Sequence, residues 1–383
     1  MSDSFDTAAL AARVDAAVAK AIAENRIVGA VVLVAKDGAI LHRGVAGLAD
    51  REAGRPMTED AIFRLASVTK PLVAAATLSL IEAGALTLDT PVSAHLPRFR
   101  PRLADGTTPD ILVRHLLTHT AGLAYGFKET AGGPYRAAGV SDGLEISGLT
   151  LDENLERIAA VPLRFAPGTG WYYSVAIDVL GALLQAVTGE TLPEIIAARV
   201  TRPLGLADTA FGATDPDRLA VPYADGDPAP LRMAGRTEVD NGEGTWLTFD
   251  PDRVFDPAAF PSGGAGMAGT AGDILRFLEA LRTGGAPILG AETVAEGSAN
   301  QIGDLPREAD DAGWRFGFFG AVLDDPAAAK TPQGRGTLQW GGAYGHTWFI
   351  DPAAGLSAVY FTNTAMEGVG GAFPTEIRDA IYG

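Results

Sequence analysis

The sequence has no cysteine among its 383 residues. This absence excludes disulfides, thiolate metal sites and a cysteine nucleophile. Basic residues are also scarce, because 30 lysines and arginines face 47 aspartates and glutamates, which leaves a formal net charge of −17. A chain of this charge is poorly suited to bind nucleic acid or an anionic membrane, and we expect neither as a partner.

Long apolar runs are missing as well. No stretch approaches the ~20 consecutive apolar residues that a membrane-spanning helix needs. The segment that ends near Asn25 alternates alanines with charged residues, unlike the continuous apolar core of a signal peptide. We therefore expect a cytoplasmic protein. The sequence carries no signal for a particular oligomeric state.

Two familiar kinds of site are absent too. No cluster of histidine, aspartate and glutamate has the spacing of a metal site, and no cofactor is implied. No serine lies in a Gly-x-Ser-x-Gly turn, so the α/β-hydrolase fold has no support.

The hydrophobic pattern places strands near both ends of the chain and helices between them. The expected helices are Thr7–Glu24, Leu112–Thr118, Asp178–Val187, Thr270–Arg282 and Pro374–Ile381, and the expected strands are Gly29–Ala35, Ala39–Gly47, Trp314–Leu323, Gly336–Trp340, Gly345–Ile350 and Leu356–Asn363. Asp37-Gly38 predicts a tight hairpin between the first two strands, and Gly189 a helix end.

This order predicts an α/β (α+β) fold, in which an antiparallel sheet built from both termini is flanked by helices and interrupted by a mostly helical domain. We expect one domain from residues 1–62 plus 262–383 and a second from residues 63–261. Residues 215–261 are rich in proline, aspartate and glycine and are the expected loop-rich insert, with mobility to match.

The most informative motif is Ser67 followed three residues later by Lys70. Pro71 fits only the first turn of a helix, and the apolar run up to Ile81 indicates that this helix is buried. Side chains three residues apart share a helix face, and the free N–H groups at a helix start favour a developing oxyanion. Ser67 is therefore the candidate nucleophile and Lys70 its base, since burial and the helix dipole both lower a lysine pKa. The alternative is a solvated serine beside a surface lysine.

Two further segments complete the candidate site. Tyr173 precedes an expected helix and is the candidate proton relay, because a phenol beside an ammonium is expected to have a lowered pKa. Its alternative role is that of a core aromatic. The segment Gln339–His346 is rich in glycine, which lets a backbone approach closely, so one of its N–H groups suits an oxyanion hole shared with the N–H of Ser67. The alternative there is a glycine bulge in an edge strand.

The order of these motifs resembles the serine β-lactamase and penicillin-binding-protein superfamily, and within it the family VIII carboxylesterases, which have the class C β-lactamase fold. The supporting stretches extend over almost the whole chain: Phe63–Pro71, Val113–Leu123, Pro167–Gly168, Tyr173–Ser174, Pro203–Thr209, Ser262–Met267 and Trp340–Gly342. The resemblance implies an acyl-enzyme on Ser67, activation by Lys70, a proton relay through Tyr173 and a second oxyanion N–H from Ala343.

Two departures from the family pattern bear on the substrate. Val175 replaces the asparagine of the β-lactamase Tyr-x-Asn motif, and Trp340-Gly341 replaces the lysine and threonine of Lys-Thr-Gly. The lost lysine contact to a substrate carboxylate is worth about 1.5–3 kcal/mol. We therefore expect neutral, short-acyl esters as substrates, with Trp340, Gly341, Gly342, Tyr125 and His346 contacting them.

Three other functions compete with ester hydrolysis. Acyl transfer to an alcohol uses the same chemistry up to deacylation. Turnover of β-lactams or D-peptides is disfavoured by Val175 and Trp340, and a scaffold without activity is disfavoured because all three candidate catalytic residues are present. Several other residues attract attention, but we expect hydrogen-bonded or core positions for them: His115, His119, Trp171, Phe127 and Trp348.

Overall fold

The protein is represented by a computed structural model that describes residues 6–242, 244–308 and 311–383. Its helices are α1 Thr7–Ala23, α2 Thr69–Glu82, α3 Val113–Leu117, α4 Pro134–Ala137, α5 Leu151–Ala160, α6 Ala176–Thr188, α7 Leu192–Ile196, α8 Arg202–Leu204, α9 Ala271–Arg282, α10 Ala291–Ser298 and α11 Phe373–Tyr382. Its strands are β1 Gly29–Lys36, β2 Ala39–Asp50, β3 Arg55–Pro56, β4 Ile62–Arg64, β5 Ala210–Phe211, β6 Tyr223–Ala224, β7 Leu231–Arg232, β8 Thr237–Gly242, β9 Thr245–Phe249, β10 Met267–Thr270, β11 Trp314–Phe316, β12 Ala321–Leu323, β13 Leu338–Gly342, β14 His346–Asp351, β15 Leu356–Thr362 and β16 Thr364–Ala365.

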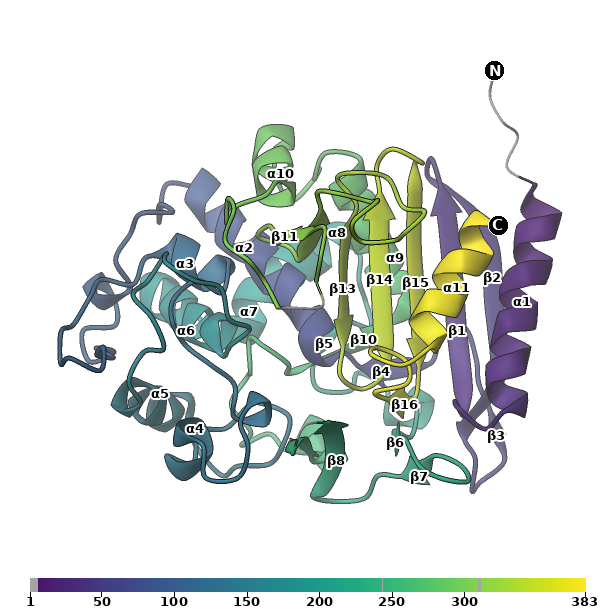
Figure 1. Ribbon diagram of the computed structural model, residues 1–383, viewed down its shortest axis with the longest axis horizontal. Coiled ribbons are helices and arrows are strands. Elements are labelled where there is room, and N and C mark those ends of the chain that lie inside the picture. Colours follow the sequence, from purple (N-terminus) through teal and green to yellow (C-terminus); the bar gives the residue numbers. More distant parts are fainter. Residues whose placement is uncertain (1–5, 243, 309–310) are drawn as a thin grey trace.

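The central feature is an eight-stranded antiparallel sheet in the order β11-β12-β13-β14-β15-β1-β2-β3. Its strands come from both ends of the chain, and β1 pairs with β15 along its length. Helices α1 and α11 lie at one side of this sheet, and α2, α3, α6 and α7 gather at the other (Figure 1). The predicted fold class is confirmed.

Strand β1 shows why both faces of the sheet are covered. Val31 and Leu33 lie in the large core that includes α2 and α9, whereas Val32 and Val34 lie in a second core with α1 and α11. Successive side chains of a strand point to opposite faces, so a strand that is apolar at every position needs two covering layers. The predicted hairpin after β1 is confirmed, with Asp37 and Gly38 at φ values of 49° and 86°.

The predicted helices are found within a residue or two of their expected ends, and Gly189 ends α6 in the left-handed conformation at φ 74°. The single strand expected at 314–323 is wrong. Gly317 donates its N–H to the Gly320 carbonyl at 2.8 Å, which folds the chain back and makes a β11–β12 hairpin.

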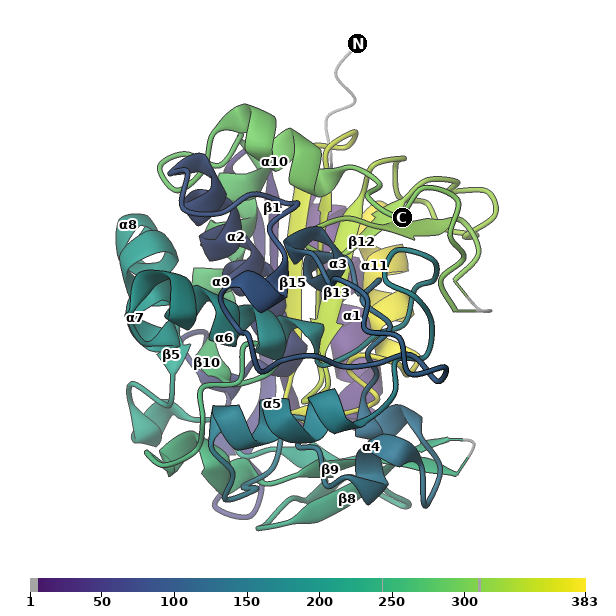
Figure 2. The same cartoon turned by 90° about the vertical axis from the view of Figure 1, so that its left-hand side faces the viewer.

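The described residues of 215–261 contain four short strands, β6 to β9, that the expected loop-rich insert did not include. Strand β6 pairs in parallel with β16, and β8 and β9 form a hairpin with Val239, Leu247 and Phe249 buried. Figure 2 shows this hairpin beneath α4 and α5. The sequence did not predict these strands because any alternation of apolar and polar residues covers only a few positions in each and is flanked by charged residues and glycines.

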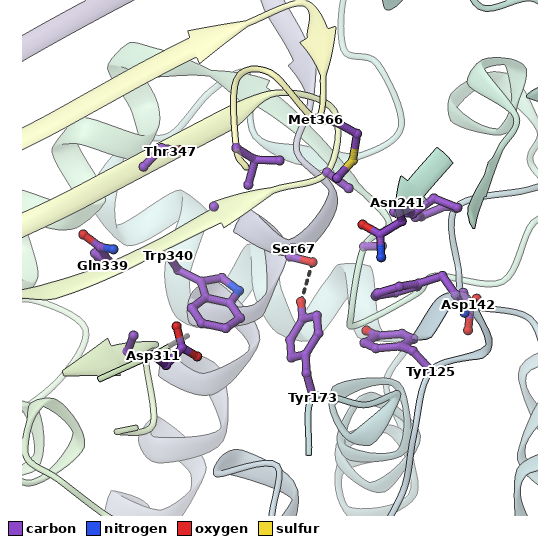
Figure 3. Close-up of a pocket in the computed structure, with 18 of the residues that line it drawn as sticks. Ser67, Tyr125, Asp142, Tyr173, Asn241, Asp311, Gln339, Trp340, Thr347 and Met366 are labelled. Carbon is purple, nitrogen blue, oxygen red and sulfur yellow. Dashed lines mark hydrogen bonds between the residues drawn. The ribbon is translucent and has the colours of Figure 1, made fainter. Parts of the chain in front are cut away.

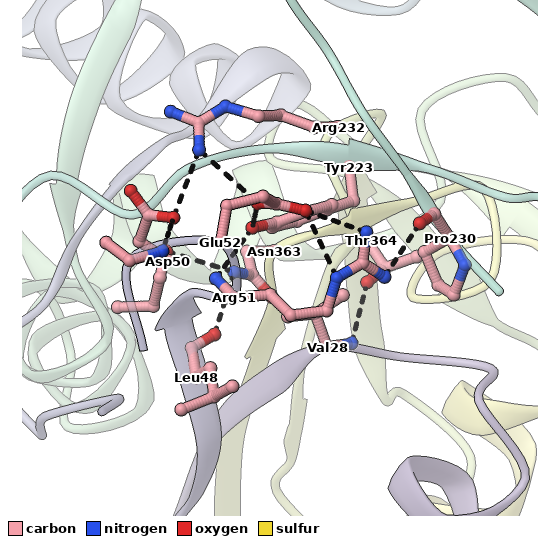
Figure 4. A network of polar contacts seen from close by, with 12 residues as sticks. Val28, Leu48, Asp50, Arg51, Glu52, Tyr223, Pro230, Arg232, Asn363 and Thr364 are labelled. Atoms are coloured by element: carbon pink, nitrogen blue, oxygen red, sulfur yellow. Dashed lines mark hydrogen bonds and ion pairs between the residues drawn. The ribbon is translucent and has the colours of Figure 1, made fainter. Parts of the chain in front are cut away.

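A polar network ties this segment to the sheet (Figure 4). Tyr223 donates to the Glu52 carboxylate at 2.6 Å and accepts from the Arg51 N–H at 2.8 Å. Arg232 lies 3.0 Å from the Asp50 carboxylate and 3.3 Å from that of Glu52. Each of these hydrogen-bonding groups has a partner, as buried and half-buried polar groups generally require.

Within the described ranges, no single helix has the length and apolar composition to span a membrane, and one pair, α6 with the stretch Leu192–Leu204, passes that test only as two pieces bent by 85°. The division into domains 1–62 plus 262–383 and 63–261 stays a prediction, and its residues 1–5 lie outside the described part of the chain.

Candidate active site

Ser67 lies on a tight turn directly before a buried helix. It is the middle residue of a single 3₁₀ turn, Ala66–Val68, and α2 begins at Thr69, which puts Pro71 in the first turn as predicted. Ala66 has a φ of 45°, a conformation that costs a non-glycine residue energy and that collects at functional sites. Ser67 is half-buried, so its hydroxyl remains accessible from the cavity described below.

Lys70 lies one turn along the same face of α2, with its Nζ 3.0 Å from the Ser67 Oγ. The side chain is buried at 5% exposure, and Nζ also donates to the Gly264 carbonyl at 2.7 Å. Burial lowers the pKa of Lys70 to about 7, against a smaller raising effect of Asp178 and Asp142. A substantial fraction of Lys70 is therefore a neutral amine near neutral pH, as a general base must be.

Tyr173 reaches Ser67 from the loop that precedes α6. Its hydroxyl donates to the Ser67 Oγ at 2.6 Å, and its ring lies 4.7 Å from the Lys70 Nζ. The expected lowering of the Tyr173 pKa is wrong. Burial raises this pKa well above its usual value and outweighs the hydrogen bond to Ser67. Tyr173 is accordingly a neutral phenol that can donate a proton.

The glycine segment closes the site from the sheet. Strand β13 ends at Gly342, where a Cβ would lie 2.2 Å from the Leu65 carbonyl oxygen, so only glycine allows this approach to the nucleophile turn. Ala343 follows and faces the same cavity as Ser67. Within the described residues, its N–H has no hydrogen-bond acceptor.

These elements surround a cavity of about 300 Å³ with Ser67 at its wall. Trp340, Gln339 and Asp311 lie on one side of Ser67, and Tyr125, Asp142 and Asn241 lie on the other (Figure 3). The described residues that line it are Ser67, Tyr125, Phe127, Asp142, Leu144, Tyr173, Asn241, Leu247, Ala265, Arg307, Asp311, Trp314, Ala321, Gln339, Trp340, Gly341, Ala343, Thr347, Met366 and Val369.

Two residues expected to contact the substrate lie elsewhere. His346 is fully buried, packs on Phe63 and Phe361, and has its Nε2 2.8 Å from the Arg64 carbonyl oxygen. Gly342 lies against the nucleophile turn and is not part of the cavity lining. The reason is the same for both, because the close approach of β13 and β14 to this turn leaves no room for a ligand between them.

The residues for which we expected hydrogen-bonded or core positions occupy such positions, with one exception. His119 is buried beside Ser174, His115 Nδ1 accepts the Leu112 N–H at 3.1 Å, and Trp171 and Trp348 lie in the core. Phe127 is the exception, because it stacks on Tyr125 and lines the cavity.

Sequence reasoning missed Asp178, which positions the backbone carbonyl that accepts a hydrogen bond from Lys70. One carboxylate oxygen accepts from the Ser262 hydroxyl at 2.5 Å and from the Gly264 N–H at 3.2 Å, and so holds the turn whose carbonyl receives Lys70. The sequence feature that could have indicated this role is that Asp178 is the only charged residue in the otherwise apolar run 175–184. The described residues contain no group of three or more metal-binding side chains.

A family model for beta-lactamase matches residues 14–379. The chain belongs to the beta-lactamase family. Esterase EstB of Burkholderia gladioli is 54% identical over 381 residues, which are 99% of this chain and 97% of that protein. EstCE1, described as a hydrolase with promiscuous acyltransferase activity, has a solved structure with a TM-score of 0.93 and 46% identity, covering 99% of this chain and 100% of that one.

A solved structure of lower sequence identity shares the fold. The structure of simvastatin synthase LovD from Aspergillus terreus has a TM-score of 0.77 at 23% identity and covers 97% of this chain and 98% of that one. The resemblance to the family VIII carboxylesterases that the motifs indicated is confirmed by the match to EstB and EstCE1.

Proposed function

We propose that this protein is a serine carboxylesterase that cleaves small, neutral, short-acyl esters through an acyl-enzyme on Ser67. The observation that carries this proposal is the convergence of the Lys70 amine and the Tyr173 hydroxyl on one serine oxygen, at 3.0 Å and 2.6 Å. The esterase names of the similar proteins support the same reaction class.

In the acylation step, the neutral Lys70 amine takes the Ser67 proton while Oγ bonds to the ester carbonyl carbon. The N–H groups of Ser67 and Ala343 hold the oxyanion that forms. Tyr173 gives its proton to the departing alkoxide and recovers one from the Lys70 ammonium. The raised pKa of Tyr173 supports this acid role, since a phenolate would have no proton to give.

Deacylation runs the same steps in reverse with water in place of the alcohol. Lys70, through Tyr173, takes the water proton, the hydroxide adds to the acyl carbon, and Ser67 leaves with the returned proton. No step needs a metal or a cofactor for its charge balance.

The cavity supports a small and uncharged substrate. Its volume of about 300 Å³ is at the lower end of ligand-binding pockets. Trp340 presents an apolar ring edge-on to Tyr173, with centroids 5.2 Å apart, where β-lactamases carry a lysine. A neutral acyl or alcohol group fits this surface better than a carboxylate does.

Acyl transfer to an alcohol is the second candidate, and one observation favours it. EstCE1, which shares 46% of its sequence with this chain, is described as a hydrolase with promiscuous acyltransferase activity. Product analysis with added alcohol measures how the acyl group divides between water and alcohol. Hydrolysis of β-lactams remains disfavoured by Val175 and Trp340, and location in the cytoplasm stays a prediction.

The test is the hydrolysis of p-nitrophenyl butyrate by the wild type and by Ser67→Ala. We expect the variant to lose at least about a thousandfold in kcat, because the acyl-enzyme route is closed. Ser79→Ala is the matched control, since Ser79 lies on the same helix α2 but does not line the cavity. Equal rates for the wild type and folded Ser67→Ala would overturn the proposal.

A further inference from the structure

The cavity contains a charged pair that the ester chemistry does not use. Arg307 and Asp311 both line it, and the Arg307 Nη2 lies 3.0 Å from an Asp311 carboxylate oxygen. The Arg307 side chain is only 7% exposed, whereas that of Asp311 is 32% exposed. An arginine this deeply buried beside a substrate cavity needs a function or a full set of partners.

Its partners are incomplete. Of the five guanidinium N–H donors, one is directed to Asp311 and another reaches the Arg315 carbonyl only at 3.5 Å. The Nε is buried and has no hydrogen-bond partner among the described residues. The exposed part of this side chain is therefore its Nη groups, which line the cavity and, among the described residues, have only the Asp311 and Arg315 partners, so Nη hydrogens remain for a ligand acceptor.

Aromatic rings fix the guanidinium in place. Its central carbon lies 5.0 Å from the ring centre of Trp171 and 5.6 Å from those of Phe316 and Trp340. Trp340 in turn packs on Tyr173. Arg307 is therefore held one indole ring away from the catalytic hydroxyls, next to Trp340 and Asp311. Figure 3 shows these two residues on the same side of Ser67.

The charge of this side of the cavity decides which acceptor fits. Asp311 neutralises Arg307, and a substrate carboxylate placed at the arginine would also face Asp311 at close range. The opposite side of the cavity adds the Asp142 carboxyl group and, among the described lining residues, no cation. A neutral oxygen, such as a keto, ester or ether oxygen, can accept a hydrogen bond from a free Arg307 Nη without this repulsion.

We infer that the Arg307–Asp311 pair is a specificity element that binds a neutral oxygen acceptor of the substrate beyond Trp340 and excludes a carboxylate at the same position. This inference rests on the proposed ester hydrolysis and adds to it a preference for esters with a second, uncharged oxygen function several bonds from the scissile carbonyl. Removing the Asp311 charge should leave the Arg307 charge unpaired, so that an ester with a carboxylate can bind at this position.

The experiment measures the ratio of kcat/KM for a carboxylate ester to that for a neutral ester of similar length. One probe pair places the charge on the acid, mono-p-nitrophenyl glutarate against p-nitrophenyl pentanoate. A second places it on the alcohol, 4-butyryloxybenzoate against phenyl butyrate, so that either orientation in the cavity is covered. The neutral p-nitrophenyl 4-oxopentanoate probes the acceptor itself.

We expect Asp311→Asn to raise the carboxylate-to-neutral ratio of kcat/KM by about 10- to 100-fold for at least one probe pair, because a charge-assisted hydrogen bond to the freed arginine contributes about that factor.

The double variant Asp311→Asn with Arg307→Gln should cancel this gain. Arg307→Gln alone should abolish any preference for the 4-oxo ester over the pentanoate. Asp142→Asn, assayed at pH 8 where Asp142 with its pKa of about 7 is ionised, is the matched control, because it removes a cavity charge that forms no ion pair with Arg307, and its ratio should change by less than about threefold. Asp311→Ser repeats the test with a second substituent.

An unchanged ratio in both Asp311 variants, or an equal gain in Asp142→Asn, would overturn the inference. The proposed function is tested separately in the same assay, since it fails only if the wild type does not hydrolyse the neutral esters.

Discussion

Two polar clusters of this protein differ in how completely their groups are satisfied. The cluster of Arg51, Glu52 and Tyr223 gives each hydrogen-bonding group a partner (Figure 4). The catalytic cluster does not, because among the residues that the structure describes Asp178 keeps one buried carboxylate oxygen without a hydrogen-bond partner and Lys70 contacts no carboxylate. The nucleophile itself follows Ala66 in a strained conformation.

This contrast separates the residues that stabilise the fold from those that carry activity. A fully paired network lowers the free energy of the folded state and has nothing to offer a substrate. Unpaired and buried groups raise that free energy. In this site, burial also keeps the pKa of Lys70 near neutral pH beside the Ser67 hydroxyl. We therefore expect changes in the catalytic cluster to abolish activity without harming the fold, and changes in the paired cluster to do the opposite.

The largest expected effect follows from Lys70→Met. This change removes the base that takes the Ser67 proton while filling the same buried space. Loss of a general base costs about 10²- to 10⁴-fold, and we expect a fall in kcat/KM for p-nitrophenyl butyrate toward the upper end of that range. Lys20→Met is the control, because Lys20 lies on the surface and pairs with Glu376. A Lys70→Met variant with more than a tenth of the wild-type rate would contradict the role of Lys70.

Tyr173→Phe should have the next largest effect. It removes the hydroxyl that lies 2.6 Å from the Ser67 Oγ and keeps the ring that packs on Trp340. We expect a loss of about 10²- to 10³-fold in kcat/KM. An ester with a very acidic leaving group, such as p-nitrophenol, should suffer less than an ethyl ester, because its leaving group needs no proton.

Tyr172→Phe provides the comparison for that result. Tyr172 is the adjacent tyrosine, contacts Arg164 and Lys128 through its ring, and does not line the cavity. An equal loss in the two variants would show that packing, not proton transfer, explains the effect.

The pH dependence of kcat/KM should show the altered titration of Lys70. The base must be neutral, so activity is present above the Lys70 pKa of about 7 and falls about tenfold per pH unit below it. A lysine with its usual pKa would instead let activity rise up to about pH 10. Asp142 also has a pKa raised by burial to about 7 and faces the cavity. Asp142→Asn should keep the profile if Lys70 is the titrating base, and loss of the inflection in this variant would reassign it.

The smallest effects concern stability, and their signs should be opposite in the two clusters. The pKa of Lys70 is lower in the folded state than in the unfolded state, so between about pH 7 and 10 the unfolded chain binds more protons and folding is opposed. Lys70→Met should therefore raise the free energy of unfolding at pH 8 by about 1–2 kcal/mol. Tyr223→Phe should lower it by about 1–2 kcal/mol, because the Arg51 N–H and the Glu52 carboxylate each lose a partner.

Denaturant unfolding of the two variants measures both changes. Activity provides the second readout, since Tyr223→Phe should keep its rate while Lys70→Met loses it. Two changes of the same sign would contradict the distinction between the clusters.

Much of the fold could be predicted because its signals are local. The apolar run in Gly29–Lys36, the Asp37-Gly38 turn and the Gly189 helix end each depend on a few neighbouring residues. The motif around Ser67 was informative for the same reason, since Lys70 and Pro71 mark the first turn of the helix that begins directly after the serine. The β11–β12 hairpin was missed because the turn glycines lie inside an apolar run.

The rest of the site depends on distant contacts that the sequence does not reveal. Burial, not the neighbouring ammonium, sets the pKa of Tyr173, and burial follows only from the packed structure. His346 was misplaced because the approach of β14 to the nucleophile turn depends on the register of the sheet. Arg307 and Asp311 come from a polar segment between α10 and β11 whose sequence has no motif.

The most direct test of the central claim is to trap the acyl-enzyme. The protein is mixed with p-nitrophenyl butyrate, quenched in acid within the first turnover and analysed by peptide mass spectrometry. We predict one butyryl group per chain, on the peptide that contains Ser67, together with a burst of p-nitrophenol, and neither with Ser67→Ala. A butyryl group on a different residue, or full turnover by Ser67→Ala, would contradict the account.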